Sequence, residues 1–125
     1  AVFASGSPFP PVRVGERTFV PGQGNNVYVF PAMGMAVFAT GARRVTDEMF
    51  IAAARGVAET VTPSDIAVGL IYPPVSAILE TELRAAAKVA DVIFERGLAT
   101  VERPSGNLEA WIRGHAYVPS YRSLV

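Results

Sequence analysis

The sequence predicts a mostly α-helical domain with one short strand and a small β-hairpin. Apolar residues recur at helical spacing through residues 47–61 and again through residues 75–96. Residues 12–20 alternate in character on either side of Gly15, which is typical of a hairpin. A short apolar run, residues 1–4, leads into a Ser-Gly-Ser-Pro turn and reads as a buried strand.

Composition limits what the chain can do. Its 125 residues are 50% hydrophobic, which is enough for one domain with a core. Eleven basic and eleven acidic residues cancel and form no basic patch, so nucleic acid is not an expected partner. The absence of cysteine excludes disulfides and thiolate chemistry and fits a reducing compartment, so we expect cytoplasmic localisation.

Membrane insertion and secretion are also not expected. The first residues lack the basic segment and apolar core of a signal peptide. The most apolar stretch, residues 27–42, is interrupted by Pro31 and Gly34 and is shorter than the roughly 20 residues that span a bilayer. We therefore interpret this stretch as a buried helix of a protein without a membrane partner.

The strand at residues 1–4 is apolar throughout, which is typical of a strand inside a sheet. The sequence offers no second strand of the same kind beside it. We therefore expect the chain to be a fragment of a longer protein that supplies the rest of the sheet. The Ser5-Gly6-Ser7-Pro8 segment that follows is, judged from its residues alone, a turn.

The segment Pro21-Gly22-Gln23-Gly24 delivers Asn25 and Asn26 to the start of an apolar helix. One interpretation is that the two asparagines only cap the helix and satisfy their own loop. The other is that an amide remains free to donate to a ligand, with the helix N-terminus favouring a carboxylate or phosphate. Asparagine does not transfer protons, so either interpretation excludes acid or base catalysis by this pair.

Residues 27–40 are apolar on every face, which predicts a helix enclosed by protein. Pro31 either kinks this helix or splits it in two. Gly41 suits its C-terminal cap. A second helix begins after Thr46, and its predicted apolar face consists of Phe50, Ala53, Val57 and Val61.

The second half of the chain carries three further helix signals. Thr62-Pro63-Ser64-Asp65 resembles a capping box, and Gly69 ends that short helix. The longest predicted helix spans residues 75–96 and stops at Gly97. Its predicted apolar stripe consists of Leu79, Leu83, Ala86, Ala90 and Ile93. Asn107 is the predicted cap of a last short helix.

Lys88 and His115 are of residue types that act in catalysis or bind metals, but their sequence surroundings do not support such a role. Lys88 lies on a helix of alternating charge, which is typical of a solvated face. His115 is the only histidine and has no cysteine or carboxylate at ligand spacing, which favours a packing or surface role. We predict no catalytic residue and no metal ligand in this chain.

Several motifs together resemble the C-terminal part of malic enzymes, the oxidative decarboxylases of malate. The resemblance covers nearly the whole chain. Its motifs follow one another in the family's order and at family-like separations, which makes it specific. The blocks are Phe3-Ala4-Ser5-Gly6-Ser7-Pro8-Phe9, GQGNNVYVFP from Gly22, Gly41-Ala42-Arg43-Arg44, Thr46-Asp47-Glu48-Met49-Phe50, Leu70-Ile71-Tyr72-Pro73-Pro74 and Tyr117-Val118-Pro119-Ser120-Tyr121.

The resemblance implies an α/β parentage. Residues 1–125 would be a single C-terminal fragment of a Rossmann-type NAD-binding domain with its C-terminal helical extension. The intact enzyme would convert malate to pyruvate and carbon dioxide with NAD or NADP and a divalent metal, Mg or Mn. Asn25 and Asn26 would hold malate, and Ser5, Gly6, Ser7 and Asn25 would line the cofactor cleft. NAD and NADP both remain open, because the residues that select between them lie upstream.

The rest of that chemistry has no counterpart in this sequence. It contains no glycine-rich dinucleotide fingerprint, no acidic metal cluster, and no tyrosine and lysine acid/base pair in the family's setting. We therefore expect the chain to be inactive alone and to complete an N-terminal portion that binds the metal.

The alternative is a non-enzymatic helical module, related to malic enzymes, that binds a ligand or oligomerises. The apolar strand and the GQGNN segment favour the enzyme. In either case, exposed apolar surface predicts a homo-oligomer.

Overall fold

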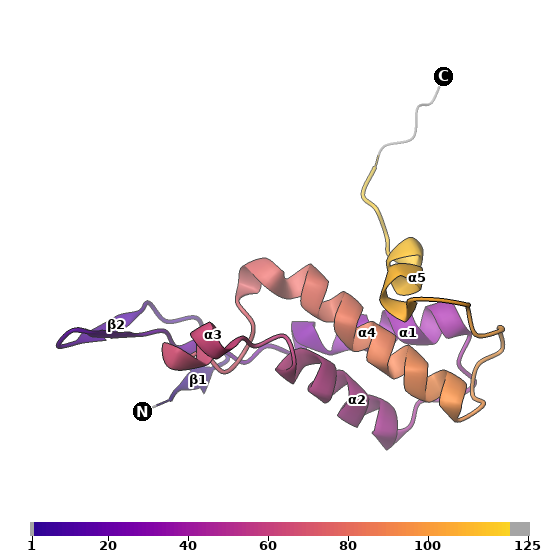
Figure 1. Ribbon diagram of the computed structural model, residues 1–125, viewed down its shortest axis with the longest axis horizontal. Helices are drawn as coiled ribbons and strands as arrows, with labels where there is room; N and C mark the ends of the chain where they lie inside the picture. The colour runs from indigo at the N-terminus through magenta and orange to yellow at the C-terminus, as the bar shows by residue number, and fades with distance from the viewer. Residues whose placement is uncertain (1, 121–125) are drawn as a thin grey trace.

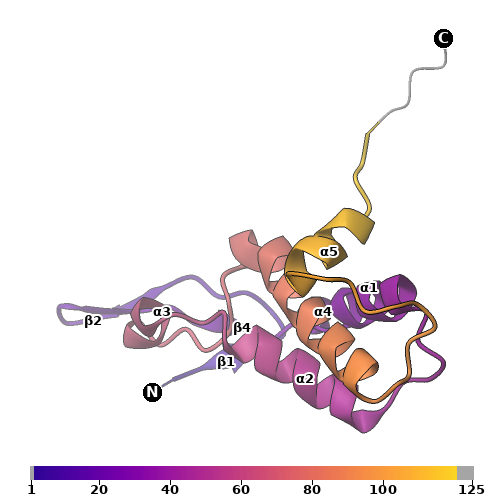
Figure 2. The same cartoon turned by 45° about the vertical axis from the view of Figure 1, so that its right-hand side comes forward.

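The computed structural model describes residues 2–120, so Ala1 of the predicted strand and Tyr121 of the last motif lie outside the described residues. Most of the helices gather at one end of the molecule, and a β-hairpin and a short helix extend from the other end (Figures 1 and 2). The elements in order are β1 (Ala4–Ser5), β2 (Val12–Val14), β3 (Arg17–Phe19), β4 (Gly22–Gln23), η1 (Asn26–Tyr28), α1 (Phe30–Thr40), α2 (Asp47–Ala58), α3 (Pro63–Ala67), η2 (Val75–Ala77), α4 (Ile78–Glu95) and α5 (Leu108–His115).

The first strand has a partner, and this corrects the sequence prediction. β1 pairs in parallel with β4, with Ala4 opposite Gly22 and Ser5 opposite Gln23. Gly22 and Gln23 carry no apolar alternation, so nothing in their sequence predicts a strand. The pairing comes from backbone geometry, since the Gly22 N–H donates to the Phe3 carbonyl at 2.9 Å.

The predicted hairpin is confirmed. β2 and β3 pair antiparallel with Val12 opposite Phe19 and Val14 opposite Arg17. Gly15 supplies the turn with a φ of 62°, a conformation that side chains disfavour. The hairpin and α3 lie side by side in both views, and the Val20 N–H donates to the Val68 carbonyl at 2.8 Å (Figures 1 and 2).

Pro31 splits the predicted apolar helix rather than kinking it. A single 3₁₀ turn, η1, precedes α1, and Pro31 occupies the first turn of α1, where its missing N–H costs nothing. Gly41 ends α1 in the left-handed conformation with a φ of 57°, as predicted. The split leaves Asn25 and Asn26 on a three-residue turn instead of at the start of a long helix.

One face of α1 is exposed, which contradicts the prediction that this helix is enclosed on every side. Ala32, Met33, Ala36 and Ala39 are buried against the other helices, but Phe30 is 61% exposed and Phe38 is 77% exposed. These two phenylalanines and Gly34 follow one another at a spacing of four residues and therefore share a face. Within this chain, α1 presents an apolar surface to solvent.

The core forms where α4 packs against α2, α1 and α5. Leu83, Ala86, Ala90 and Ile93 of the predicted α4 stripe are buried, as expected. Leu79 is 56% exposed, so its place in that stripe was predicted wrongly, because the buried part of α4 begins at Thr81 and Leu79 lies in the first turn before it.

The predicted face of α2 is also corrected. Ala53 and Val57 are buried as expected, whereas Phe50 is 44% exposed and Met49 is fully buried in its place. Gly56 faces α4 so closely that a Cβ added to it would lie 2.6 Å from the Cα of Ala85. The place where α2 crosses α4 decides which residues of α2 face inward, so the large side chain of Phe50 is not among them.

Two of the three predicted N-terminal caps, those of α3 and α5 but not that of α2, are confirmed. Thr62 and Asp65 form a reciprocal capping box on α3, and Asn107 accepts the Ala110 N–H at 2.9 Å on α5. Hydrogen bonds from Thr62 lower the pKa of Asp65. Thr46 precedes α2 as predicted, but its side chain makes no capping bond. No helix within residues 2–120 is long and apolar enough to cross a membrane.

Glu82 of α4 is the only buried charged side chain among the described residues, at 8% exposed. Burial raises the pKa of its carboxyl, because the charged form loses solvation. A carboxyl whose pKa rises on folding binds its proton more tightly in the folded state. Its stabilising contribution is therefore greatest below the unfolded-state pKa of about 4.3 and is lost as the pH rises through the raised value.

We expect Glu82→Gln to remove this pH-dependent loss. The variant and the unsubstituted full-length protein should unfold at similar temperatures at acid pH, and the variant should unfold at a higher temperature at neutral pH. Thermal unfolding followed at several pH values measures both. A variant that is less stable by the same amount at every pH would show that the Glu82 carboxylate is not penalised by burial.

Candidate functional site

Two loops meet at one edge of the β1–β4 pair. Because the strands are parallel, their carboxyl ends lie at the same edge, where Ser5 ends β1 and Gln23 ends β4. The Gly24 N–H donates to the Ser5 carbonyl at 2.9 Å, which extends the pairing one residue beyond β4. Loops beyond the carboxyl ends of parallel strands are where open α/β sheets bind ligands.

The Ser5–Ser7 loop is held in place by its own residues and by the neighbouring strand. The Ser5 hydroxyl donates to the Ser7 carbonyl at 3.0 Å. The Gln23 side-chain amide donates to the Gly6 carbonyl, also at 3.0 Å, and ties the loop to β4. Neither the Gly6 N–H nor the Ser7 N–H donates to another backbone group within residues 2–120. A Cβ on Gly6 would meet no atom within 4 Å, so the surroundings of the loop are open.

Asn25 and Asn26 follow β4 after a single residue, Gly24, and are both exposed. The Asn25 side-chain oxygen accepts the Val27 N–H at 3.0 Å, so the oxygen is used locally and the amide group remains available as a donor. Asn25 therefore caps η1, as one of the two interpretations predicts. The helix-dipole contribution we expected does not apply, because η1 is three residues long and α1 begins only at Phe30.

Aromatic rings pack against the loop that carries the asparagines. A Cβ on Gly24 would lie 3.4 Å from the ring of Tyr72, and a Cβ on Gly22 would lie 3.5 Å from the same ring. Tyr72 stacks on Tyr28, with ring centroids 6.3 Å apart and an interplanar angle of 17°. Tyr28 is buried, its hydroxyl donates to the Pro73 carbonyl at 2.7 Å, and burial raises its pKa.

Sequence reasoning missed three residues that shape this region: Gln23, Tyr28 and Tyr72. Gln23 gave no signal, because a single glutamine between two glycines is ordinary loop composition. The signal for the tyrosines was available in the aromatic residues placed next to Pro73 and two residues after Asn26. Their contact joins segments 44 residues apart in the chain, which periodicity alone does not reveal.

The residues present do not fit a divalent metal. No group of three or more His, Cys, Asp and Glu side chains that could hold an ion occurs within residues 2–120. His115 instead contacts Trp111, with ring centroids 4.5 Å apart and its Nδ1 2.9 Å from the Trp111 carbonyl oxygen. Lys88 pairs with Glu59 at 2.8 Å on the surface, which agrees with its predicted solvated role.

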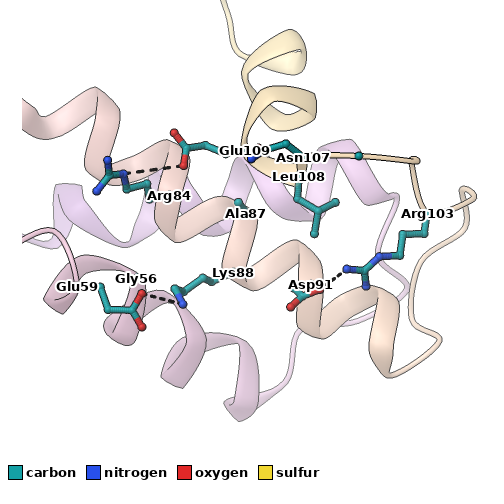
Figure 3. A pocket seen from close by; sticks show the side chains of 11 residues that line it. Gly56, Glu59, Arg84, Ala87, Lys88, Asp91, Arg103, Asn107, Leu108 and Glu109 are labelled. Carbon is teal, nitrogen blue, oxygen red and sulfur yellow. Dashed lines mark hydrogen bonds and ion pairs between the residues drawn. The ribbon is translucent and has the colours of Figure 1, made fainter.

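A hollow of about 470 Å³ lies elsewhere in the molecule, between α2, α4 and the segment before α5 (Figure 3). Its walls carry three basic and three acidic side chains. Each basic group is paired with an acid across the hollow, in the pairs Arg84–Glu109, Lys88–Glu59 and Arg103–Asp91. Because these charges cancel locally, the hollow has no excess charge with which to select an anion. The two loops at the edge of β1 and β4 remain the candidate site.

Comparison with known proteins shows the family to which the chain belongs. The sequence model described as "Malic enzyme, NAD binding domain" matches residues 1–94, which is three-quarters of the chain. The chain belongs to the malic enzyme family. The resemblance inferred from the motifs is thereby confirmed. The match covers β1 to β4 and also α1, α2, α3 and most of α4.

The similarity extends over nearly the whole chain. The NADP-dependent malic enzyme of Dictyostelium discoideum is 48% identical over 120 residues, 96% of this chain and 22% of that protein. The NADP-dependent malic enzyme of Vitis vinifera is 48% identical over 123 residues, 98% of this chain and 21% of that protein. The mitochondrial NADP-dependent malic enzyme of Homo sapiens is 42% identical over 124 residues, 98% of this chain and 20% of that protein. The chain thus spans about a fifth of the length of these relatives.

Proposed function

We propose that this chain is the C-terminal part of a malic enzyme that oxidatively decarboxylates malate to pyruvate and carbon dioxide, with NADP as the oxidant. The observation that carries the proposal is the meeting of the Ser5–Ser7 loop and the Asn25–Asn26 pair at one edge of two parallel strands. The similar malic enzymes of Dictyostelium discoideum, Vitis vinifera and Homo sapiens are NADP-dependent, which supports NADP over NAD.

In this proposal Asn25 and Asn26 hold malate. The oxygen of Asn25 is used by Val27, so its amide group is oriented by the cap and donates outward. Amide donors suit carboxylate acceptors, and hydrogen bonds to a charged acceptor are stronger than neutral ones. Both side chains are exposed in this chain, so they form one wall of a site whose other walls the rest of the enzyme would supply.

The Ser5–Ser7 loop, together with Asn25, lies beside the dinucleotide in this proposal. The loop leaves the Gly6 and Ser7 N–H groups without a backbone acceptor in the described part of the chain, and backbone N–H groups are suited to phosphate oxygens. The space around Gly6 is open enough for close approach. When bound, the dinucleotide supplies hydride acceptance, and the chain's contribution is to bind and orient.

The acid, the base and the metal ligands belong, in this proposal, to the part of the enzyme outside this chain. The described residues offer no cluster suited to Mg or Mn. The chain alone is therefore inactive. The exposed face of α1 at Phe30 and Phe38 packs against that other part, because a helix apolar on all faces is normally buried. Association into a homo-oligomer and cytoplasmic localisation stay predictions.

The test is an assay of two purified proteins, the full-length protein that contains this chain and the 125-residue chain alone. With malate and a divalent metal, the full-length protein should reduce NADP and release equal amounts of pyruvate and carbon dioxide. NAD should be used at least about tenfold less efficiently in kcat/KM. The isolated chain should reduce neither nucleotide. Absence of pyruvate formation by the full-length protein would exclude the proposed reaction, and equal use of NAD would exclude the cofactor assignment.

A further inference from the structure

We infer that Tyr72 is a positioning residue for the two asparagines and acts through its ring rather than through its hydroxyl. The inference rests on the proposed function, because it assigns Tyr72 to the malate-binding loop. Tyr72 lies 46 residues beyond Asn26 in the sequence and contacts the loop only through the fold.

The first support is the contact between the Tyr72 ring and the loop backbone. A Cβ on Gly24 would lie 3.4 Å from both Cε2 and Cζ of Tyr72. The Gly22 N–H and the Gly24 N–H donate to the carbonyls of Phe3 and Ser5, each at 2.9 Å. The segment that leads into Asn25 is therefore clamped by two contacts: hydrogen bonds join it to β1, and the flat ring of Tyr72 covers the side to which a Cβ would point.

The second support is that the same ring reaches the residues after the asparagines. Tyr72 stacks on Tyr28, which lies two residues after Asn26. The Tyr28 hydroxyl donates to the carbonyl of Pro73, the residue that follows Tyr72. The stacked pair thus fixes the chain on both sides of Asn25 and Asn26, which restricts where their side chains can lie.

The third support explains the two glycines. Neither Gly22 nor Gly24 has a positive φ, so the backbone conformation does not require glycine at either position. The close approach of other atoms does limit Gly22, where a Cβ would lie 3.3 Å from the Cβ of Ala4. Both glycines face the Tyr72 ring, so the absence of a side chain at these positions lets the ring pack directly on the loop backbone.

The test uses the full-length protein with Tyr72→Phe and Tyr72→Leu. Phenylalanine keeps the flat ring, so its KM for malate should stay within about twofold of the unsubstituted value. Leucine loses the stacking and lets the loop shift, so KM for malate should rise about tenfold with a smaller change in kcat. Equal effects of the two substitutions, or no effect of leucine, would overturn the inference.

A double-substitution cycle separates positioning from general destabilisation. If Tyr72 acts through Asn26, then Tyr72→Leu should change the KM for malate much less when Asn26 is already alanine. Additive effects would show that Tyr72 acts elsewhere. If Asn26→Ala alone leaves the KM unchanged, the proposed malate role of Asn26 fails. If Asn26→Ala raises the KM and Tyr72→Leu does not, only the Tyr72 inference fails.

A second variant keeps the test decisive if Tyr72→Leu does not fold. Tyr28→Phe keeps the stacked ring and removes the 2.7 Å hydrogen bond to Pro73. It should raise the KM for malate about threefold, and this rise should also shrink in the Asn26→Ala background. If Tyr72→Leu does not fold and Tyr28→Phe leaves the KM for malate unchanged, the hydrogen bond to Pro73 does not help to position the asparagines and the inference is overturned.

Discussion

Replacing Asn26 with alanine in the full-length protein is expected to raise the KM for malate about 10- to 100-fold, because a hydrogen bond to a charged acceptor contributes about 1.5–3 kcal/mol. Asn26 is exposed, and no hydrogen bond of its side chain to another described residue competes with a ligand. The fold should therefore survive the change. Steady-state kinetics with malate as the varied substrate, together with the unfolding temperature, measure both effects.

Asn107→Ala is the matched control for this prediction. It makes the same chemical change at an asparagine whose oxygen caps α5 through the Ala110 N–H. Loss of such a cap costs about 1 kcal/mol of stability and should leave the KM for malate unchanged. If Asn26→Ala lowers stability as Asn107→Ala does and leaves the KM unaltered, then Asn26 has only a local structural role, which is the capping interpretation.

The second large effect is expected at the crossing of α2 and α4. Gly56→Ala adds a methyl group 2.6 Å from the Cα of Ala85, which is backbone that has no flexible end to move aside. The two helices must separate, so we expect a net loss of about 2 kcal/mol, even though alanine favours helix over glycine by about 1 kcal/mol. Chemical denaturation or thermal unfolding of the full-length protein measures the loss.

Gly114→Ala provides the matched comparison. Gly114 also lies within a helix, α5, and a Cβ there would meet no atom within 4 Å. Alanine should therefore stabilise this position by about 0.5–1 kcal/mol through helix propensity alone. If Gly56→Ala proves as favourable as Gly114→Ala, the close approach of α2 and α4 cannot be a feature of the folded protein.

The paired charges of α4 and α5 add little to this account of stability. Arg113 forms a two-bond contact with Glu80, at 3.0 and 2.6 Å, and this contact lowers the pKa of Glu80. Both side chains are about half exposed, so solvent screens the attraction. The buried surface between α4 and its neighbours, rather than these ion pairs, holds α5 in place.

Local signals determined most of the secondary structure in advance. Capping residues and glycines act within one turn of chain, so the Thr62–Asp65 box, the Asn107 cap and the stop at Gly41 could each be read from adjacent residues. The hairpin around Gly15 is local for the same reason. The ordered motifs, being a property of sequence alone, also determined membership of the malic enzyme family.

Tertiary structure decided what depends on residues far apart in the chain. The sequence could not show that Gly22 and Gln23 form a strand, because their pairing partner is β1 and not a neighbouring residue. Nor could it show that Phe50 and Leu79 face solvent, since helical spacing defines a stripe but not which helix covers it. The tie from Gln23 to Gly6 and the packing of Tyr72 on Gly24 arise the same way. The sequence thus identifies the residues of the candidate site, but only long-range contacts bring them to one edge of the β1–β4 pair. The reason is that the spacing of residues within one segment carries no information about which distant residues contact that segment.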